Sequence, residues 1–188
     1  MFCEFICKAL IIKMIKKINV MLIGFMGVGK TSVSRELSKK LDMPEIDMDK
    51  IIVDRENKSI NDIFTENGEE YFRKIETECL IDIQKSKGYI VSCGGGVVVK
   101  DENINHMKDG GVILLLTATP ETVYNRVKDD DSRPILKGNK NVEFIEQLMN
   151  KRKDRYLAVA DIIISTDDKT ISEIVDEITD KLEEFAKK

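Results

Sequence analysis

The stretch G-F-M-G-V-G-K-T, which starts at Gly24, has the residue types and spacing of a phosphate-binding loop. Gly24, Gly27 and Gly29 would allow successive backbone N–H groups to turn inward and surround an anion. Lys30 would reach the β- and γ-phosphates of a nucleoside triphosphate, and the Thr31 hydroxyl would bind Mg²⁺. An ordinary glycine-rich turn is the alternative. The apolar run before the loop and the helical pattern after it favour phosphate binding.

Two carboxylates could complete a phosphoryl-transfer site, which needs a metal ion, cations and a residue that orients the acceptor. In I-D-M-D, Asp47 and Asp49 alternate along an expected strand end, so both would face the phosphate-binding loop at the carboxyl edge of a sheet. One could hold a metal-bound water while the other takes an acceptor hydroxyl. A pair of solvated turn aspartates is the alternative.

The run S-C-G-G-G, residues 92–96, follows another expected strand. Consecutive glycines cost backbone entropy and expose the backbone, which suggests a ligand lying against it, with an unusually tight turn as the alternative. No acidic residue ends this strand, so metal binding would fall to Thr31 and Asp47.

Several arginines could supply cations for an acidic substrate, because a planar guanidinium suits bidentate binding of a carboxylate. Arg73 lies on an expected helix with Glu70 and Glu76 three residues to either side, so a surface ion pair is the alternative there. The other candidates are Arg126, Arg133, Arg152 and Arg155.

Short apolar runs alternate with longer helical patterns along the chain, which is typical of β-α-β units around a parallel sheet. The expected strands are residues 19–23, 44–49, 89–92, 112–117 and 162–165, and the best-defined helices are 30–41 and 171–185. Five buried strands predict an α/β fold with a doubly wound, three-layer sheet. The charged, turn-rich stretch from Lys128 has the composition of a mobile lid, with a plain surface loop as the alternative.

The chain of 188 residues is long enough for one well-filled core, and its net charge of -4 with intermixed signs argues against nucleic acid as the main partner. The four cysteines show no C-x-x-C spacing, and with a single histidine, His106, they predict a reducing cytosol rather than a zinc site. Residues 1–17 are broken by charges too often to span a membrane. Either they form an amphipathic extension, or translation begins at Met14. The start at Met14 is the preferred interpretation.

Together these segments resemble shikimate kinase from about Ile18 to the C-terminus. The resemblance rests on the order of the motifs: G-F-M-G-V-G-K-T, I-D-M-D, S-I-N-D-I-F-x-x-x-G-E-x-x-F-R-x-I-E, G-G-G, R-P-I-L and R-x-x-x-Y-x-x-V-A. The phosphate-binding loop is shared by many nucleotide enzymes, whereas the joint F-R-x-I-E, triple-glycine and R-P-x-L set is much narrower.

The resemblance implies a P-loop NTPase fold of the nucleoside monophosphate kinase type, formed by residues 18–188 as one domain with a lid at about 126–141. It implies phosphorylation of the 3-hydroxyl of shikimate by ATP with Mg²⁺, in a cytoplasmic, monomeric enzyme of the pathway to chorismate and aromatic amino acids. Neither a membrane nor a nucleic acid is expected as a partner.

The resemblance also assigns roles to single residues. Asp49, Lys30 and Arg133 would be catalytic, Thr31 and Asp47 would hold the metal, and Glu76 would fix Arg73. The implied shikimate contacts are Asp49, Arg73, Gly94, Gly95, Gly96 and Arg152. The implied nucleotide contacts are Gly27, Val28, Gly29, Lys30, Thr31, Ser32, Arg126 against adenine, and Arg133 from the lid.

Three other functions are weighed for a chain with a phosphate-binding loop. Gluconate or another small hydroxylated metabolite could be the acceptor, although the two arginines matched to a carboxylate speak against it. A regulatory GTPase would need N-K-x-D, and the nearest string, N-K-N-V at Asn139, lacks the aspartate. A shikimate sensor without catalysis would need a broken site.

The aspartates at 129–131 would repel a polyphosphate if the lid closed them onto it.

Overall fold

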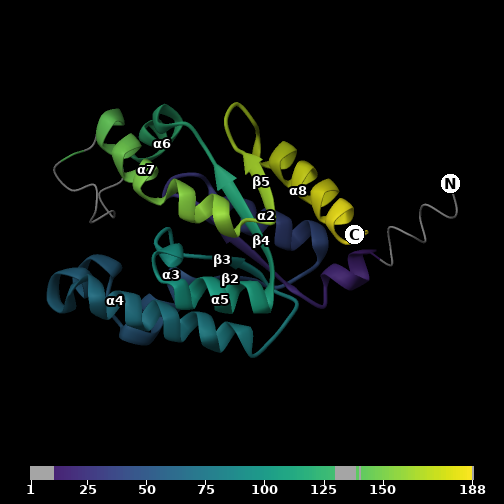
Figure 1. The fold of residues 1–188 in the computed structure, drawn as a ribbon, viewed down its shortest axis with the longest axis horizontal. Helices are drawn as coiled ribbons and strands as arrows, with labels where there is room; N and C mark the ends of the chain where they lie inside the picture. Colours follow the sequence, from purple (N-terminus) through teal and green to yellow (C-terminus); the bar gives the residue numbers. More distant parts are fainter. Residues whose placement is uncertain (1–10, 130–138, 140, 188) are drawn as a thin grey trace, which may run out of the picture.

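The alternating apolar runs form a five-stranded parallel sheet with the strand order β2-β3-β1-β4-β5 (Figure 1). The computed structural model describes residues 11–129, 139 and 141–187. The strands are β1 (Asn19–Ile23), β2 (Glu45–Asp47), β3 (Ile90–Ser92), β4 (Gly111–Thr117) and β5 (Ile162–Ser165). The helices are α2 (Lys30–Leu41), α3 (Met48–Glu56), α4 (Ile60–Gln84), α5 (Asp101–Gly110), α6 (Pro120–Val127), α7 (Val142–Val159) and α8 (Ile171–Phe185), with a 3-10 turn, η1 (Val97–Val99).

Helices cover both faces of the sheet, which confirms the three-layer α/β prediction. Along β1, Val20 and Leu22 face a core that α2, α6 and α8 close, while Met21 and Ile23 face a second core under α3, α4 and α5. Figure 1 shows α2 and α8 on one side of the sheet and α3, α4 and α5 on the other. Because both faces are covered, the central strands are continuous apolar runs and not alternating ones.

The observed bounds agree with the sequence for β1, β5, α2 and α8, but β2 is shorter than predicted. β2 ends at Asp47, whose side chain accepts a hydrogen bond from the Lys50 N–H and thereby caps α3. Asp49 therefore lies in the first turn of a helix. The prediction that Asp47 and Asp49 alternate along one strand was wrong.

The long helix α4 is interrupted at Gly68, which has φ 82° and ψ 170°. Ser59 caps its first part by accepting a hydrogen bond from the Asp62 N–H. The interruption changes the direction of the helix before the turn that carries Arg73 and Glu76, which face the loop after β3.

The segment before β1 is described from residue 11, where Ile11 and Ile15 are buried in the core beneath α2 and α8. The division of the chain at residue 17 stays a prediction. Among the described helices, none has both the length and the apolar character needed to cross a membrane.

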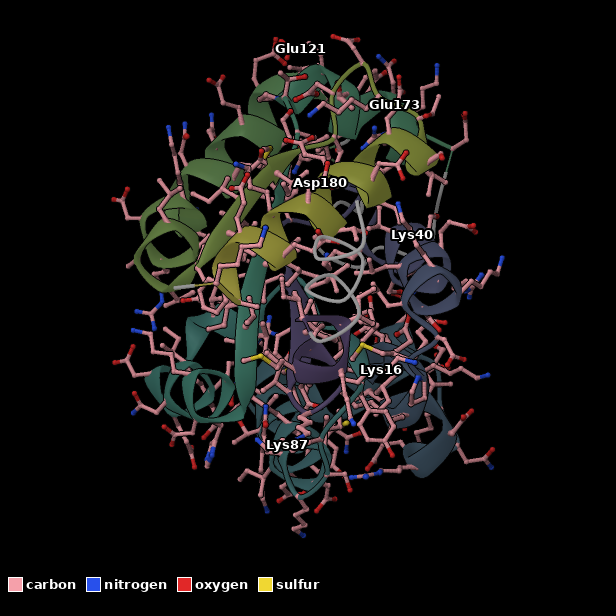
Figure 2. The ribbon with its side chains drawn as sticks, turned by 90° about the vertical axis from the view of Figure 1, so that its right-hand side faces the viewer. Lys16, Lys40, Lys87, Glu121, Glu173 and Asp180 are labelled. Atoms are coloured by element: carbon pink, nitrogen blue, oxygen red, sulfur yellow. The ribbon has the colours of Figure 1, made fainter. Side chains whose placement is uncertain are left out.

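Charged side chains of both signs lie on the outside of the molecule, and some of them tie neighbouring segments together (Figure 2). Lys16 donates to Asp42 at the end of α2 over 2.7 Å, and Lys40 of α2 pairs with Asp176 of α8. The side chains labelled in Figure 2 are Lys16, Lys40, Lys87, Glu121, Glu173 and Asp180.

Candidate active site

An open cavity of about 830 Å³ lies at the carboxyl ends of the strands, where ligands bind in open α/β sheets. It runs from the phosphate-binding loop to the loop after β3 and the facing turn of α4. The residues singled out in the sequence that line it are Gly27, Val28, Gly29, Lys30, Thr31, Ser32, Asp47, Asp49, Arg73, Glu76, Gly94, Gly95, Gly96, Arg126 and Arg152. The fold thus brings together residues that are far apart along the chain.

The phosphate-binding loop joins β1 to α2, as its sequence predicts. Gly27 has φ 79°, and a Cβ there would lie 2.6 Å from Cγ1 of Val127 in α6, so only glycine fits. Lys30 Nζ donates to the carbonyls of Gly24, at 2.9 Å, and Phe25, at 3.0 Å. The ammonium therefore lies over its own loop, where a phosphate would be cradled.

Thr31 and Asp47 meet at the start of α2, where the Thr31 hydroxyl donates to the Asp47 carboxylate over 3.1 Å. The described residues hold no group of three His, Cys, Asp or Glu side chains suited to a metal ion. Mg²⁺ does not need such a group, because it is commonly bound through one or two carboxylates together with waters and substrate phosphates. A hydroxyl and a carboxylate beside a phosphate cradle therefore fit Mg²⁺.

Two carboxylates approach Gly94 at the other end of the cavity. A Cβ on Gly94 would lie 2.5 Å from Oε1 of Glu76 and 3.1 Å from Oδ1 of Asp49. Glu76 is fully buried, and its Oε1 has no hydrogen-bond partner among the described residues. Burial raises the pKa of the Glu76 carboxyl, and the Arg73 guanidinium opposes that rise. The first glycine of the run leaves room for both carboxylates.

Arg73 is buried, with 6% of its surface exposed, so it is not the surface ion pair that the helical spacing allowed. Its Nη1 donates to Glu76 over 2.9 Å and its Nη2 donates to Glu69 over 2.9 Å, whereas Glu70 has no part in the pair. Burial alone lowers the pKa of Arg73, but Glu76 and Glu69 outweigh it, so the pKa is raised. A Cβ on Gly96 would overlap this guanidinium, so the last glycine of the run is needed for a close approach.

Arg152 reaches the same end of the cavity from α7. Its Nη1 donates to the carbonyl oxygen of Gly95 over 3.0 Å. This end of the cavity therefore holds two guanidinium groups, two carboxylates and a glycine-rich backbone, while the phosphate-binding loop lies at the other end.

The comparisons with known proteins agree with this arrangement. Residues 26–183 match the family model described as "Shikimate kinase". The chain belongs to the shikimate kinase family. The shikimate kinase of Persephonella marina is 44% identical over 164 residues, which cover 87% of this chain and 98% of that protein.

Solved shikimate kinases share the fold over nearly the whole chain. The structure titled "Shikimate kinase from Acinetobacter baumannii in complex with shikimate" is 28% identical, with a TM-score of 0.86 and coverage of 91% of this chain and 96% of that one. The shikimate kinase from Aquifex aeolicus is 37% identical, with a TM-score of 0.78 and coverage of 89% and 98%. The family and the fold predicted from the sequence are therefore confirmed.

The other arginines considered in the sequence of this shikimate kinase family member lie in places different from those of Arg73 and Arg152. Arg126 of α6 donates to the Thr166 hydroxyl and carbonyl, both over 2.9 Å, and its Nη1 also reaches the carbonyl of Val28 at 3.3 Å. Arg155 does not line the cavity, because its Nε donates to the Val98 carbonyl. Arg133 and most of the predicted lid lie outside the described residues.

Some cavity residues were missed in the sequence. Thr166 and Lys169 follow β5 and line the cavity near Arg126. The rule that parallel strands end at one edge of the sheet could have found them, since the polar run T-D-D-K directly follows the strand. Phe64 and Phe72 of α4 also line the cavity, with their ring centroids 4.7 Å apart. Their helical spacing is the same as that of core residues, so the sequence gave no sign that they line the cavity.

Proposed function

We propose that this chain transfers the γ-phosphoryl group of ATP to the 3-hydroxyl of shikimate, forming shikimate 3-phosphate on the route to chorismate and the aromatic amino acids. The observation that carries the proposal is one cavity with a phosphate cradle at one end and two guanidinium groups beside Asp49 at the other. Shikimate is a hydroxylated ring with a single carboxylate, so it needs both a cationic contact and a group that orients one hydroxyl.

At the nucleotide end, the residues from Gly27 to Ser32 would bind the phosphates of ATP. The backbone of the loop and the N-terminus of α2 provide N–H groups and a positive dipole end. Lys30 would leave the Gly24 and Phe25 carbonyls to contact the transferring phosphoryl group. Arg126, held against Thr166, would pack against the adenine, and Arg133 would close over the phosphates.

Mg²⁺ would be held by Thr31 and Asp47, whose side chains already meet at 3.1 Å. When bound, the ion neutralises charge on the phosphate oxygens during transfer. Asp47 also caps α3, so its position is fixed by the helix start as well as by Thr31.

At the acceptor end, Arg152 and Arg73 would bind the shikimate carboxylate, and the backbone from Gly94 to Gly96 would lie against the ring. Charge-assisted bonds from a guanidinium are about twice as strong as neutral ones. Asp49 would accept a hydrogen bond from the 3-hydroxyl and aim its oxygen at the phosphate. Because phosphoryl transfer is loose, this orientation contributes even before the proton moves.

The direct test measures ADP release by the purified chain with ATP and Mg²⁺, comparing shikimate, gluconate and no acceptor. We expect release that depends on shikimate. Release that depends on gluconate would move the acceptor assignment to another hydroxylated acid, and binding of ATP without release for either acceptor would contradict the proposed reaction.

Arg152→Ala is expected to weaken shikimate binding by about 2 kcal/mol, or roughly thirty-fold, because one charge-assisted bond to the carboxylate is lost. ATP binding should be unchanged. The control is Arg155→Ala, which removes the same side chain from the same helix at a position that contacts Val98 outside the cavity. The assignment fails if calorimetry gives the two variants the same shikimate affinity.

We also propose that the enzyme acts as a cytoplasmic monomer without a nucleic acid or membrane partner. Sedimentation of the active enzyme at assay concentration tests it.

A further inference from the structure

The carbonyl oxygen of Gly95 accepts two hydrogen bonds from the same face of α7. Arg152 donates one of them over 3.0 Å, and the hydroxyl of Tyr156 donates the other. The two donors are four residues apart, so they lie one turn from each other on the helix. The middle glycine of the cavity wall is thus held by two side chains.

This glycine lies where the two ends of the cavity come together. A Cβ on Gly95 would be 3.3 Å from the backbone N of Met26 in the phosphate-binding loop. On either side, Gly94 approaches Asp49 and Gly96 approaches the Arg73 guanidinium. A small rotation of the Gly95 peptide would therefore disturb the acceptor end of the cavity.

The two donors differ in whether they would have to leave the Gly95 carbonyl when the acceptor binds. The Arg152 guanidinium is one of the cations proposed to bind the acceptor carboxylate, and reaching that carboxylate would weaken its bond to Gly95. The Gly95 carbonyl is half-buried, and a carbonyl shielded from water costs free energy when its last donor leaves, whereas one that keeps a second donor does not. Tyr156 is 5% exposed and lines the core rather than this cavity, so its hydroxyl does not have to leave Gly95 when the acceptor binds.

We propose that Tyr156 is a positioning residue for the acceptor. Its hydroxyl keeps the Gly95 carbonyl bonded and so releases Arg152 to bind the carboxylate. The inference rests on the proposed function, since it concerns how the acceptor subsite assembles.

The chemistry of Tyr156 suits this task. Burial raises the pKa of Tyr156 to about 12, and Arg152 opposes the rise. The hydroxyl therefore stays protonated and remains a donor throughout the range in which the enzyme would work. No pH dependence of shikimate binding is expected from this residue.

The test uses Tyr156→Phe in the full chain, which removes the hydroxyl and keeps the ring. We expect shikimate binding, measured by calorimetry, to weaken about ten-fold, as for the loss of one buried hydrogen bond, with kcat reduced less than KM is raised. ATP affinity should stay within two-fold of wild type, roughly the scatter of such comparisons. Unchanged shikimate affinity, or an equal loss of ATP affinity, would overturn the inference.

Tyr71→Phe is the matched control. Its hydroxyl donates to the Glu56 carboxylate over 2.9 Å, away from the cavity, so the same atom and one hydrogen bond are lost at a different place. Shikimate affinity in this variant should equal that of wild type. A ten-fold loss there as well would mean that the effect of Tyr156→Phe is general, and the inference would be abandoned.

A second set of variants tests the coupling to Arg152. In the Arg152→Ala background no guanidinium needs to be released, so adding Tyr156→Phe should change shikimate affinity by less than about three-fold. Fully additive losses would show that Tyr156 acts without Arg152 and would overturn the inference. Wild-type protein that releases no ADP with shikimate would overturn the proposed function and the inference together, whereas an active wild type with an unaffected Tyr156→Phe overturns the inference alone.

Discussion

Asp49→Asn is expected to lower kcat by about 100-fold or more, the range found for groups that orient or deprotonate a reacting hydroxyl. Asparagine keeps the shape of the side chain but cannot take the proton, and it turns an acceptor oxygen into a donor or a neutral carbonyl. ATP affinity should be unchanged, because the N–H groups of the phosphate-binding loop and the Thr31–Asp47 contact stay in place. Steady-state kinetics with shikimate and equilibrium binding of ATP measure the two effects separately.

Asp54→Asn is the matched control for this prediction. Asp54 lies on the same helix, α3, but is exposed and does not line the cavity. The same loss of one charge there should leave kcat within about two-fold of wild type, as for surface substitutions away from any special feature. A kcat close to wild type in Asp49→Asn, or a parallel fall in ATP affinity, would remove Asp49 from its proposed role.

The parts of the site that the sequence predicted correctly are governed by local rules. Three glycines, a lysine and a hydroxyl at fixed spacing define a backbone path between a strand and a helix, so β1, the loop and α2 follow with the right bounds. The sheet can be predicted in the same way, because apolar runs separated by helical patterns favour parallel pairing of the strands with helices on both faces.

The carboxylates show where a local rule was applied to the wrong element. The prediction treated I-D-M-D as extended throughout, although Asp directly before the first residue of a helix is a strong capping signal. Asp47 caps α3, and Asp49 reaches the cavity from a helical turn. Both side chains line the cavity nonetheless, Asp47 from the cap and Asp49 from the first turn, so the predicted proximity to the cavity was right for an incorrect reason.

The burial of Arg73 could not be obtained from its spacing to neighbouring acids. Glutamates three or four residues away are common on exposed helices, where each pair is worth only a few tenths of a kcal/mol. What buries Arg73 is the approach of Gly96 from the loop after β3, which is distant in sequence. Tyr156 stands in the R-x-x-x-Y-x-x-V-A motif but received no role from the sequence for a related reason, since its partner is a backbone carbonyl that only the fold brings near α7.

Glu76→Ala is expected to destabilise the protein by about 3–5 kcal/mol, because it leaves the buried Arg73 charge with a single, solvent-facing partner. The side chains of Arg73 and Glu76 are 7% and 1% exposed, whereas that of Glu69 is 59% exposed. For a chain of this length the loss corresponds to a fall in Tm on the order of 10 °C. Urea unfolding followed by circular dichroism measures the free energy, and calorimetry measures Tm.

Glu69→Ala separates burial from charge, because it removes the other carboxylate bonded to the same guanidinium. Its expected cost is below about 1 kcal/mol, as for exposed ion pairs. Equal losses in Glu69→Ala and Glu76→Ala would mean that burial of the pair does not decide its strength. The double variant Arg73→Leu with Glu76→Leu carries the argument further, since apolar residues that replace a whole buried pair often restore stability. It should be more stable than Glu76→Ala yet bind shikimate poorly. That result would mean that the buried pair serves the acceptor subsite and not the stability of the fold.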